Sequence, residues 1–130
     1  MTTLYELVGG EPVFRKLVAE FYRGVAGDPV LRPLYPDDLG PAEERLRMFL
    51  VQYWGGPGTY SEQRGHPRLR MRHVAWVVGE RERDAWLQHM SAAVAGLEVP
   101  EEARAAIWDH LERAAYSLVN APPAEDSLLR

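Results

Sequence analysis

The stretch Gly65-His66-Pro67-Arg68-Leu69-Arg70-Met71-Arg72-His73 is the one around which the rest of the chain is organised. It places several guanidinium groups beside an imidazole at its end, that of His73. An imidazole is a common metal ligand, and arginines bind carboxylates and phosphates through paired hydrogen bonds. A histidine beside arginines is, however, more often a solvated or hydrogen-bonded surface residue than a ligand. The residues of this stretch alone leave both interpretations open.

Length and composition indicate one globular domain. A chain of 130 residues can bury a single core and is too short for two ordinary domains. Its content of 46% hydrophobic and 26% charged residues is typical of a folded protein. The formal net charge of -4 argues against a general binder of nucleic acid. The local arginines could still hold one anionic group; they are Arg64, Arg68, Arg70 and Arg72.

The chain contains no cysteine, which excludes disulfide bonds, thiolate metal sites and covalent haem attachment through Cys-x-x-Cys-His. Its first residues show no basic segment followed by an apolar run, as a secretory signal would. No stretch approaches the roughly 20 apolar residues that cross a bilayer. We therefore expect a cytoplasmic protein without a membrane partner.

The spacing of apolar residues predicts helices and no convincing strand. Thr3-Leu4-Tyr5-Glu6 has the spacing of a capping box, and Gly9-Gly10 stops the short helix that it begins. A longer helix starts near Pro12 and ends at Gly27-Asp28-Pro29. Its apolar residues recur three and four positions apart: Val13, Phe14, Leu17, Val18, Phe21, Tyr22 and Val25.

The middle of the chain combines one helix with a long connection. Prolines at 33 and 36 allow only a short helical turn before Pro41 opens the next helix. Gly55-Gly56-Pro57-Gly58 ends that helix and begins a connection over 55–67 that is long enough to suggest a functional loop. No regular strand is predicted for the apolar run at 74–78. The face expected to be buried after Pro41 comprises Ala42, Leu46, Phe49, Leu50 and Tyr53.

Two further helices complete the predicted fold, one starting at Glu80 and the other at Pro100. The apolar stripe of the first contains Ala85, Trp86, Met90, Ala93, Val94 and Leu97. That of the second contains Ala103, Ile107, Trp108, Leu111, Ala114, Ala115 and Leu118. The tail over 121–130 has little to bury and is expected to be disordered. The sequence therefore predicts one all-α domain over residues 1–120.

Two long runs of the sequence resemble the group II truncated haemoglobins, a family of bacterial globins. They are Ala42-Glu43-Glu44-Arg45-Leu46-Arg47-Met48-Phe49-Leu50-Val51-Gln52-Tyr53-Trp54-Gly55-Gly56-Pro57 and Tyr60-Ser61-Glu62-Gln63-Arg64-Gly65-His66-Pro67-Arg68-Leu69-Arg70-Met71-Arg72-His73, and the similarity covers roughly residues 3–120. The resemblance implies a truncated globin fold, in which a two-over-two helical sandwich surrounds a haem b held non-covalently. It also implies that His73 is the proximal ligand of the haem iron.

The same resemblance implies which residues lie on the opposite, distal side of the haem. Ala42 occupies the position of the distal histidine of most familiar globins, so no imidazole would lie above the iron. Polar aromatic residues take over this role in the family, and the matching residues are Tyr22, Tyr35 and Trp86. Oxygen held at ferrous iron becomes more polar, so O–H and N–H donors would stabilise it. Without the resemblance, each is more often a buried aromatic whose polar atom bonds to the backbone.

Five more residues are candidates for contact with the haem itself. A flat apolar disc with two carboxylates on one edge needs an apolar slot and cations at its mouth. Leu46 and Phe49 could form a wall of the slot, although residues of this type are more often ordinary core residues on sequence alone. The candidates at the mouth are Arg45, Tyr60 and Arg72.

No chemistry is assigned to His66, His89 and His110, for which a capping or hydrogen-bonding role is expected. No dinucleotide-binding, Walker or catalytic-triad motif is present. The first functional hypothesis is reversible binding of oxygen, carbon monoxide or nitric oxide at ferrous iron. A redox enzyme, peroxidase-like or a nitric oxide dioxygenase, would use the same pocket with an external reductase. A haem-free helical interaction module is the third hypothesis. The sequence does not separate these three, and a homo-oligomer stays open.

Overall fold

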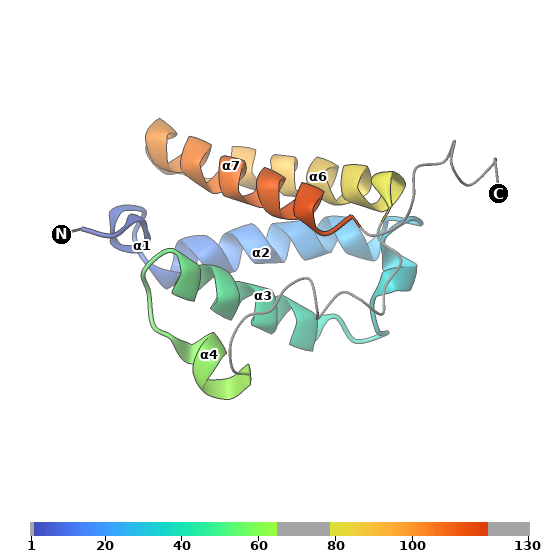
Figure 1. The fold of residues 1–130 in the computed structure, drawn as a ribbon, viewed down its shortest axis with the longest axis horizontal. Coiled ribbons are helices and arrows are strands. Elements are labelled where there is room, and N and C mark those ends of the chain that lie inside the picture. The colour runs from blue at the N-terminus through green and yellow to red at the C-terminus, as the bar shows by residue number, and fades with distance from the viewer. Residues whose placement is uncertain (1, 65–78, 120–130) are drawn as a thin grey trace.

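The computed structural model describes residues 2–64 and 79–119, and every regular element within these ranges is a helix (Figure 1). The elements are α1 (Leu4–Leu7), α2 (Glu11–Ala26), the 3₁₀ helix η1 (Arg32–Leu34), α3 (Gly40–Tyr53), α4 (Thr59–Arg64), α6 (Glu80–Ala95) and α7 (Glu101–Ser117). The predicted all-α class is confirmed. The expectations for His66, for the run at 74–78, for His73 with its neighbouring arginines and for the tail at 121–130 lie outside the described residues.

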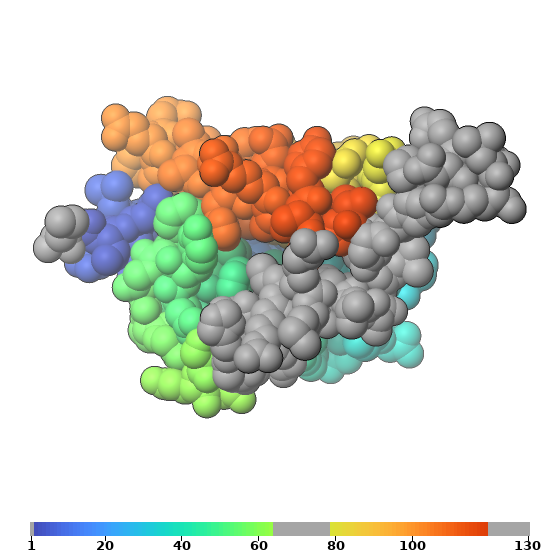
Figure 2. Space-filling model, in the orientation of Figure 1, coloured from blue at the N-terminus to red at the C-terminus, as the bar shows by residue number. Residues whose placement is uncertain are grey.

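The long helices form two layers (Figure 1). In one layer α6 packs against α7, and in the other α2 packs against α3. The layers meet where α2 packs against α6. Figure 2 shows α4 projecting from the molecule below α3, against which it packs. This arrangement is the two-over-two helical sandwich expected from the sequence.

The first turn of the chain forms as its capping box predicts. The backbone N–H of Glu6 donates to Oγ1 of Thr3 over 3.2 Å, which satisfies one of the open donors at the start of α1. Gly9 and Gly10 have φ angles of 106° and 85°, a region that favours glycine. The chain therefore turns sharply after α1 and enters α2. The N–H of Tyr5 donates to the carbonyl of Trp54 over 3.0 Å and fixes α1 beside the end of α3.

The core lies between the two layers and is centred on α2. One face of this helix buries Phe14, Leu17, Val18, Phe21, Tyr22 and Val25. The facing residues of α6 and α7 are those predicted from their periodicity, with Met90 and Ile107 fully buried. Removing a side chain of this size from water stabilises the fold by about 1.5–3 kcal/mol. The periodic stripes of α2, α6 and α7 are therefore the surfaces that join the layers.

Two expectations for the middle of the chain are wrong. Tyr53 was expected to be buried but is 52% exposed, whereas Met48 and Val51 of α3 are buried. The reason is that α3 has apolar residues on more than one face, and α2 covers only one of these faces. The segment expected to be a loop contains the helix α4. Oε1 of Gln52 accepts from the N–H of Ser61 over 2.9 Å, and Nε2 of Gln52 donates to Oγ of Ser61 over 2.7 Å. A helix this short is marginal in isolation. Contacts with α3 therefore stabilise α4, and local sequence does not reveal them.

Candidate functional site

Three aromatic residues from different elements meet beside the core. Tyr22 comes from α2, Tyr35 directly follows η1, and Trp86 comes from α6. The ring of Tyr22 lies edge-on to that of Tyr35, with centroids 5.6 Å apart and planes at 83°. The indole of Trp86 packs at 5.2 Å against the ring of Phe21, which itself lies 5.0 Å from Tyr22. The three residues expected on the distal side are thus brought together, and we call them the aromatic triad.

The polar atoms of the aromatic triad influence one another's ionisation. Burial raises the pKa of the Tyr22 hydroxyl, and the hydrogen bond that it donates to Tyr35 raises this pKa further. Burial also raises the pKa of Tyr35, while the bonds that its oxygen accepts from Tyr22 and from the indole N–H of Trp86 lower it. Both phenols are therefore neutral at physiological pH. A hydroxyl that accepts two hydrogen bonds is polarised, which makes it a stronger donor.

The bend that carries Tyr35 is held by a residue that sequence reasoning missed. The guanidinium of Arg32 donates to the carbonyls of Tyr35 at 3.2 Å, of Pro36 at 3.0 Å and of Asp37 at 2.8 Å. These bonds fix the backbone of the bend, and with it the position of the Tyr35 ring. The prolines at 33 and 36 predict a bend, but nothing in the sequence identifies Arg32 as the side chain that stabilises it.

A second group of candidate residues lies along α3. Ala42 is buried with 7% of its surface exposed, and Leu46 and Phe49 are half-buried against the core. The ring of Phe49 meets that of Tyr60 edge-on at 5.6 Å, and Tyr60 is itself buried. Arg45 is half-buried, and its positive charge opposes the rise in the pKa of Tyr22. Arg72 and His73 lie outside the described residues.

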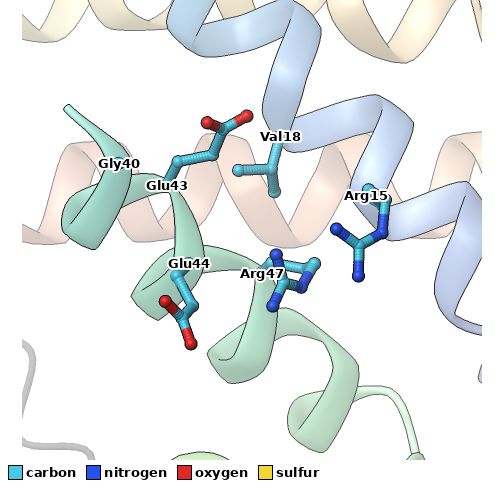
Figure 3. A pocket seen from close by; sticks show the side chains of 6 residues that line it. All are labelled: Arg15, Val18, Gly40, Glu43, Glu44 and Arg47. Carbon is cyan, nitrogen blue, oxygen red and sulfur yellow. The ribbon is translucent and has the colours of Figure 1, made fainter.

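A separate cleft of about 400 Å³ opens between α2 and α3 (Figure 3). Charges of both signs line it, with Arg15 and Arg47 facing Glu43 and Glu44. Both arginines also pair with Glu11, whose Oε2 lies 2.6 Å from Arg15 and 3.3 Å from Arg47. The hydrogen bond from Arg15 lowers the pKa of the Glu11 carboxyl. The charged lining of this cleft is unlike the apolar slot that a flat apolar disc needs, and none of the candidate residues lines it.

The two described histidines outside the site differ in what they contact. Nε2 of His89 lies 2.6 Å from Oδ2 of Asp28, so the expected hydrogen-bonding role is confirmed. His110 instead stacks on Tyr53, with ring centroids 3.8 Å apart. Within residues 2–64 and 79–119, no three histidine, aspartate or glutamate side chains are arranged to hold a metal ion. No helix of that part of the chain is long and apolar enough to cross a membrane.

Comparison with known proteins shows to which protein family this chain belongs. Residues 3–120 match the bacterial-like globins. The chain is 39% identical over 122 residues to the group 2 truncated haemoglobin YjbI of Bacillus subtilis, an alignment that covers 94% of this chain and 92% of that protein. Among solved structures it is similar to a thermostable haemoglobin of Thermobifida fusca, with 60% identity, a TM-score of 0.92 and coverage of 94% and 100% of the two chains. It is also similar to the group II truncated haemoglobin of Bacillus anthracis, with 36% identity, a TM-score of 0.89 and 95% of each chain covered.

The two-over-two helices and these matches define a haem protein of the globin type. The chain belongs to the group II truncated haemoglobins.

The described residues fit a haem in their chemistry. Leu46 and Phe49 offer half-buried apolar surface, and Ala42 on the same helix has a small side chain. The aromatic triad contributes neutral O–H and N–H groups and no charge. Arg45 supplies a cation on the same helix. An apolar wall, uncharged donors and a nearby cation suit a flat apolar group with carboxylates on one edge.

Proposed function

We propose that this chain holds haem b non-covalently through His73 and binds oxygen and other diatomic gases reversibly. The observation that carries the proposal is the aromatic triad, in which three polar groups from α2, α6 and the bend after η1 are joined at the Tyr35 hydroxyl. When bound, haem supplies a ferrous iron at which a diatomic gas can bind. The assignment of His73 rests on the family and on the matched run of sequence that ends at this residue.

The chain's own residues would divide the work between them. Leu46 and Phe49 form an apolar wall against the face of the ring, and Ala42 leaves room for a small ligand. Arg45, Tyr60 and Arg72 would bind the carboxylates at the mouth. Because position 42 carries no imidazole, the proposed donors of a hydrogen bond to the ligand are Tyr22, Tyr35 and Trp86.

The aromatic triad would also favour oxygen over carbon monoxide. Oxygen becomes more polar than carbon monoxide in such a site, so a neutral donor stabilises oxygen more, by about 1 kcal/mol for one hydrogen bond. Both phenols stay protonated because burial raises their pKa. The site therefore favours oxygen over a wide range of pH. A cytoplasmic location and a role in oxygen transport belong to this proposal, and cell fractionation tests the first.

The absorption spectrum of the purified protein tests the proposal directly. Oxidised, reduced and carbon monoxide-treated samples should show haem bands that shift with each treatment, and His73→Ala should lose most of its haem. His89→Gln, a change at a histidine of α6, is the control and should keep the wild-type haem content. A colourless protein after expression with ample haem, or a His73→Ala variant with the unchanged spectrum, would refute the proposal.

A further inference from the structure

A hydrogen bond between side chains ties α6 to the turn that follows α2. Nε2 of His89 and Oδ2 of Asp28 lie 2.6 Å apart, with 25% and 12% of the two side chains exposed. The other carboxylate oxygen, Oδ1, accepts from the N–H of Val30 over 2.7 Å and from the N–H of Leu31 over 3.2 Å. Asp28 therefore uses one oxygen to hold α6 and the other to cap the turn that leads into η1.

The imidazole of His89 occupies a space that the sequence keeps open. A Cβ atom at Gly24 would lie 2.2 Å from Nδ1 and 2.7 Å from Cγ of His89. Such distances are far below van der Waals contact. Glycine at position 24 of α2, which costs helix stability relative to alanine, is thus what allows the ring to reach Asp28.

Each residue of the Asp28–His89 pair lies on the same segment as one member of the aromatic triad. Trp86 lies one helical turn before His89 on α6, so both side chains project from the same side of that helix. Tyr35 directly follows η1, and Asp28 caps the turn at the start of this segment. Any shift of α6 against that turn changes the distance between the indole N–H of Trp86 and the hydroxyl of Tyr35. Arg32 holds the bend internally and does not bond to α6 in the part of the chain described.

We propose that His89 and Asp28 are positioning residues that set the placement of the Trp86 indole relative to Tyr35 and thereby the rate of oxygen release. A hydrogen bond weakens steeply once its distance or angle departs from the optimum, so a small displacement of α6 is sufficient. The effect on oxygen release rests on the proposed function, whereas the effect on the indole N–H can be measured whether or not the protein binds oxygen.

The experiment follows the indole N–H of Trp86 in protein labelled with ¹⁵N at tryptophan, in the ferrous carbon monoxide form, with the signal assigned through Trp86→Phe. In His89→Leu, which cannot donate to Asp28, the indole proton should exchange roughly fivefold faster, which corresponds to about 1 kcal/mol. His89→Gln keeps a donor at the same reach and should restore slow exchange. His110→Leu, a change at the other described helical histidine, should leave this signal unchanged.

Gly24→Ala is the second variant, because it displaces the imidazole while every donor and acceptor is retained. It should speed both indole exchange and oxygen release in the same direction as His89→Leu. Unchanged indole exchange in both folded variants would overturn the proposal, and so would faster exchange with unaltered oxygen release. A protein that takes up no oxygen would refute the proposed function, while indole exchange would still decide whether His89 and Asp28 position Trp86.

Discussion

The hydroxyl of Tyr35 is the atom at which the polar groups of the site meet. It accepts from Tyr22 on α2 and from Trp86 on α6, although these two residues are far apart in the chain. An indole N–H can only donate, so the direction of its bond is fixed by chemistry. Replacing Trp86 or Tyr22 by phenylalanine therefore removes one donor each and keeps an aromatic ring.

Trp86→Phe should speed the release of oxygen by up to about fivefold, because it removes the indole donor that polarises the Tyr35 hydroxyl, and one neutral hydrogen bond is worth about 1 kcal/mol. The release of carbon monoxide should change less, since this gas is less polar in the site. Removal of the indole also opens space, so both gases should enter faster. Stopped-flow measurements separate entry from release.

Two further variants complete this test. Tyr22→Phe should act in the same direction as Trp86→Phe because it removes the other bond to Tyr35. Trp108→Phe changes a half-buried tryptophan of α7 outside the aromatic triad and should alter neither rate of release. Identical release of both gases from wild type, Trp86→Phe and Tyr22→Phe would mean that these residues serve packing alone.

At the scale of the elements, the turn between α2 and η1 depends on one carboxylate. The hydrogen bond from His89 is the main cause that lowers the pKa of Asp28, and the N–H groups of Val30 and Leu31 act in the same direction. A carboxyl group whose pKa is lower in the folded state stabilises the fold when it is ionised. This contribution is complete above about pH 5 and is lost as the pH falls through about 3.9, the ordinary aspartate value, toward the lower folded value.

Asp28→Asn should therefore flatten the loss of stability in acid. The free energy of unfolding, measured in urea between pH 5 and pH 3, should fall less steeply for this variant than for wild type. Asp109→Asn removes a carboxylate from an exposed ion pair with Arg113 on α7 and serves as the matched control. Equal slopes for wild type and Asp28→Asn would contradict a stabilising role for this carboxylate.

The elements also show how far sequence can predict this fold. The bounds of α2, α6 and α7 follow from the spacing of apolar residues and from the glycines and prolines at their ends, which are local signals. The wrong expectations fall on α3 and α4. Two apolar faces on α3 made Tyr53 look buried, and the bonds between Gln52 and Ser61 stabilise α4 from outside its own sequence.

The candidate site was predictable only in part, because contacts between distant residues leave no local signal in the sequence. Tyr22, Tyr35 and Trp86 were expected through the family resemblance, and spacing alone would have left them as buried aromatics. The bond between Asp28 and His89 joins residues 61 positions apart. Neither residue carries a local signal for the other, so contacts of this kind appear only in three dimensions.

At the scale of the whole molecule, haem retention depends on more than one bond. Apolar contact with the walls, ion pairs at the mouth and the bond from His73 to iron would act together in the proposed site. The apolar contact with the walls involves large surfaces. Its contribution to haem binding should therefore remain when a single polar residue is replaced. Single substitutions should therefore rank in a definite order, with the iron ligand first.

His73→Ala should lose haem much faster than wild type to an acceptor globin, because it removes the only proposed bond between protein and iron. Arg72→Ala removes one partly exposed ion pair, which contributes only about 0.2–1 kcal/mol, so haem loss should rise at most about fivefold. Arg45→Ala should behave like Arg72→Ala if both arginines bind the carboxylates, and Arg113→Ala on α7 is a control that should change nothing. The transfer rate reports each variant. If Arg72→Ala loses haem as fast as His73→Ala, the ion pair would matter as much as the iron bond, and the proposed division of roles would be wrong.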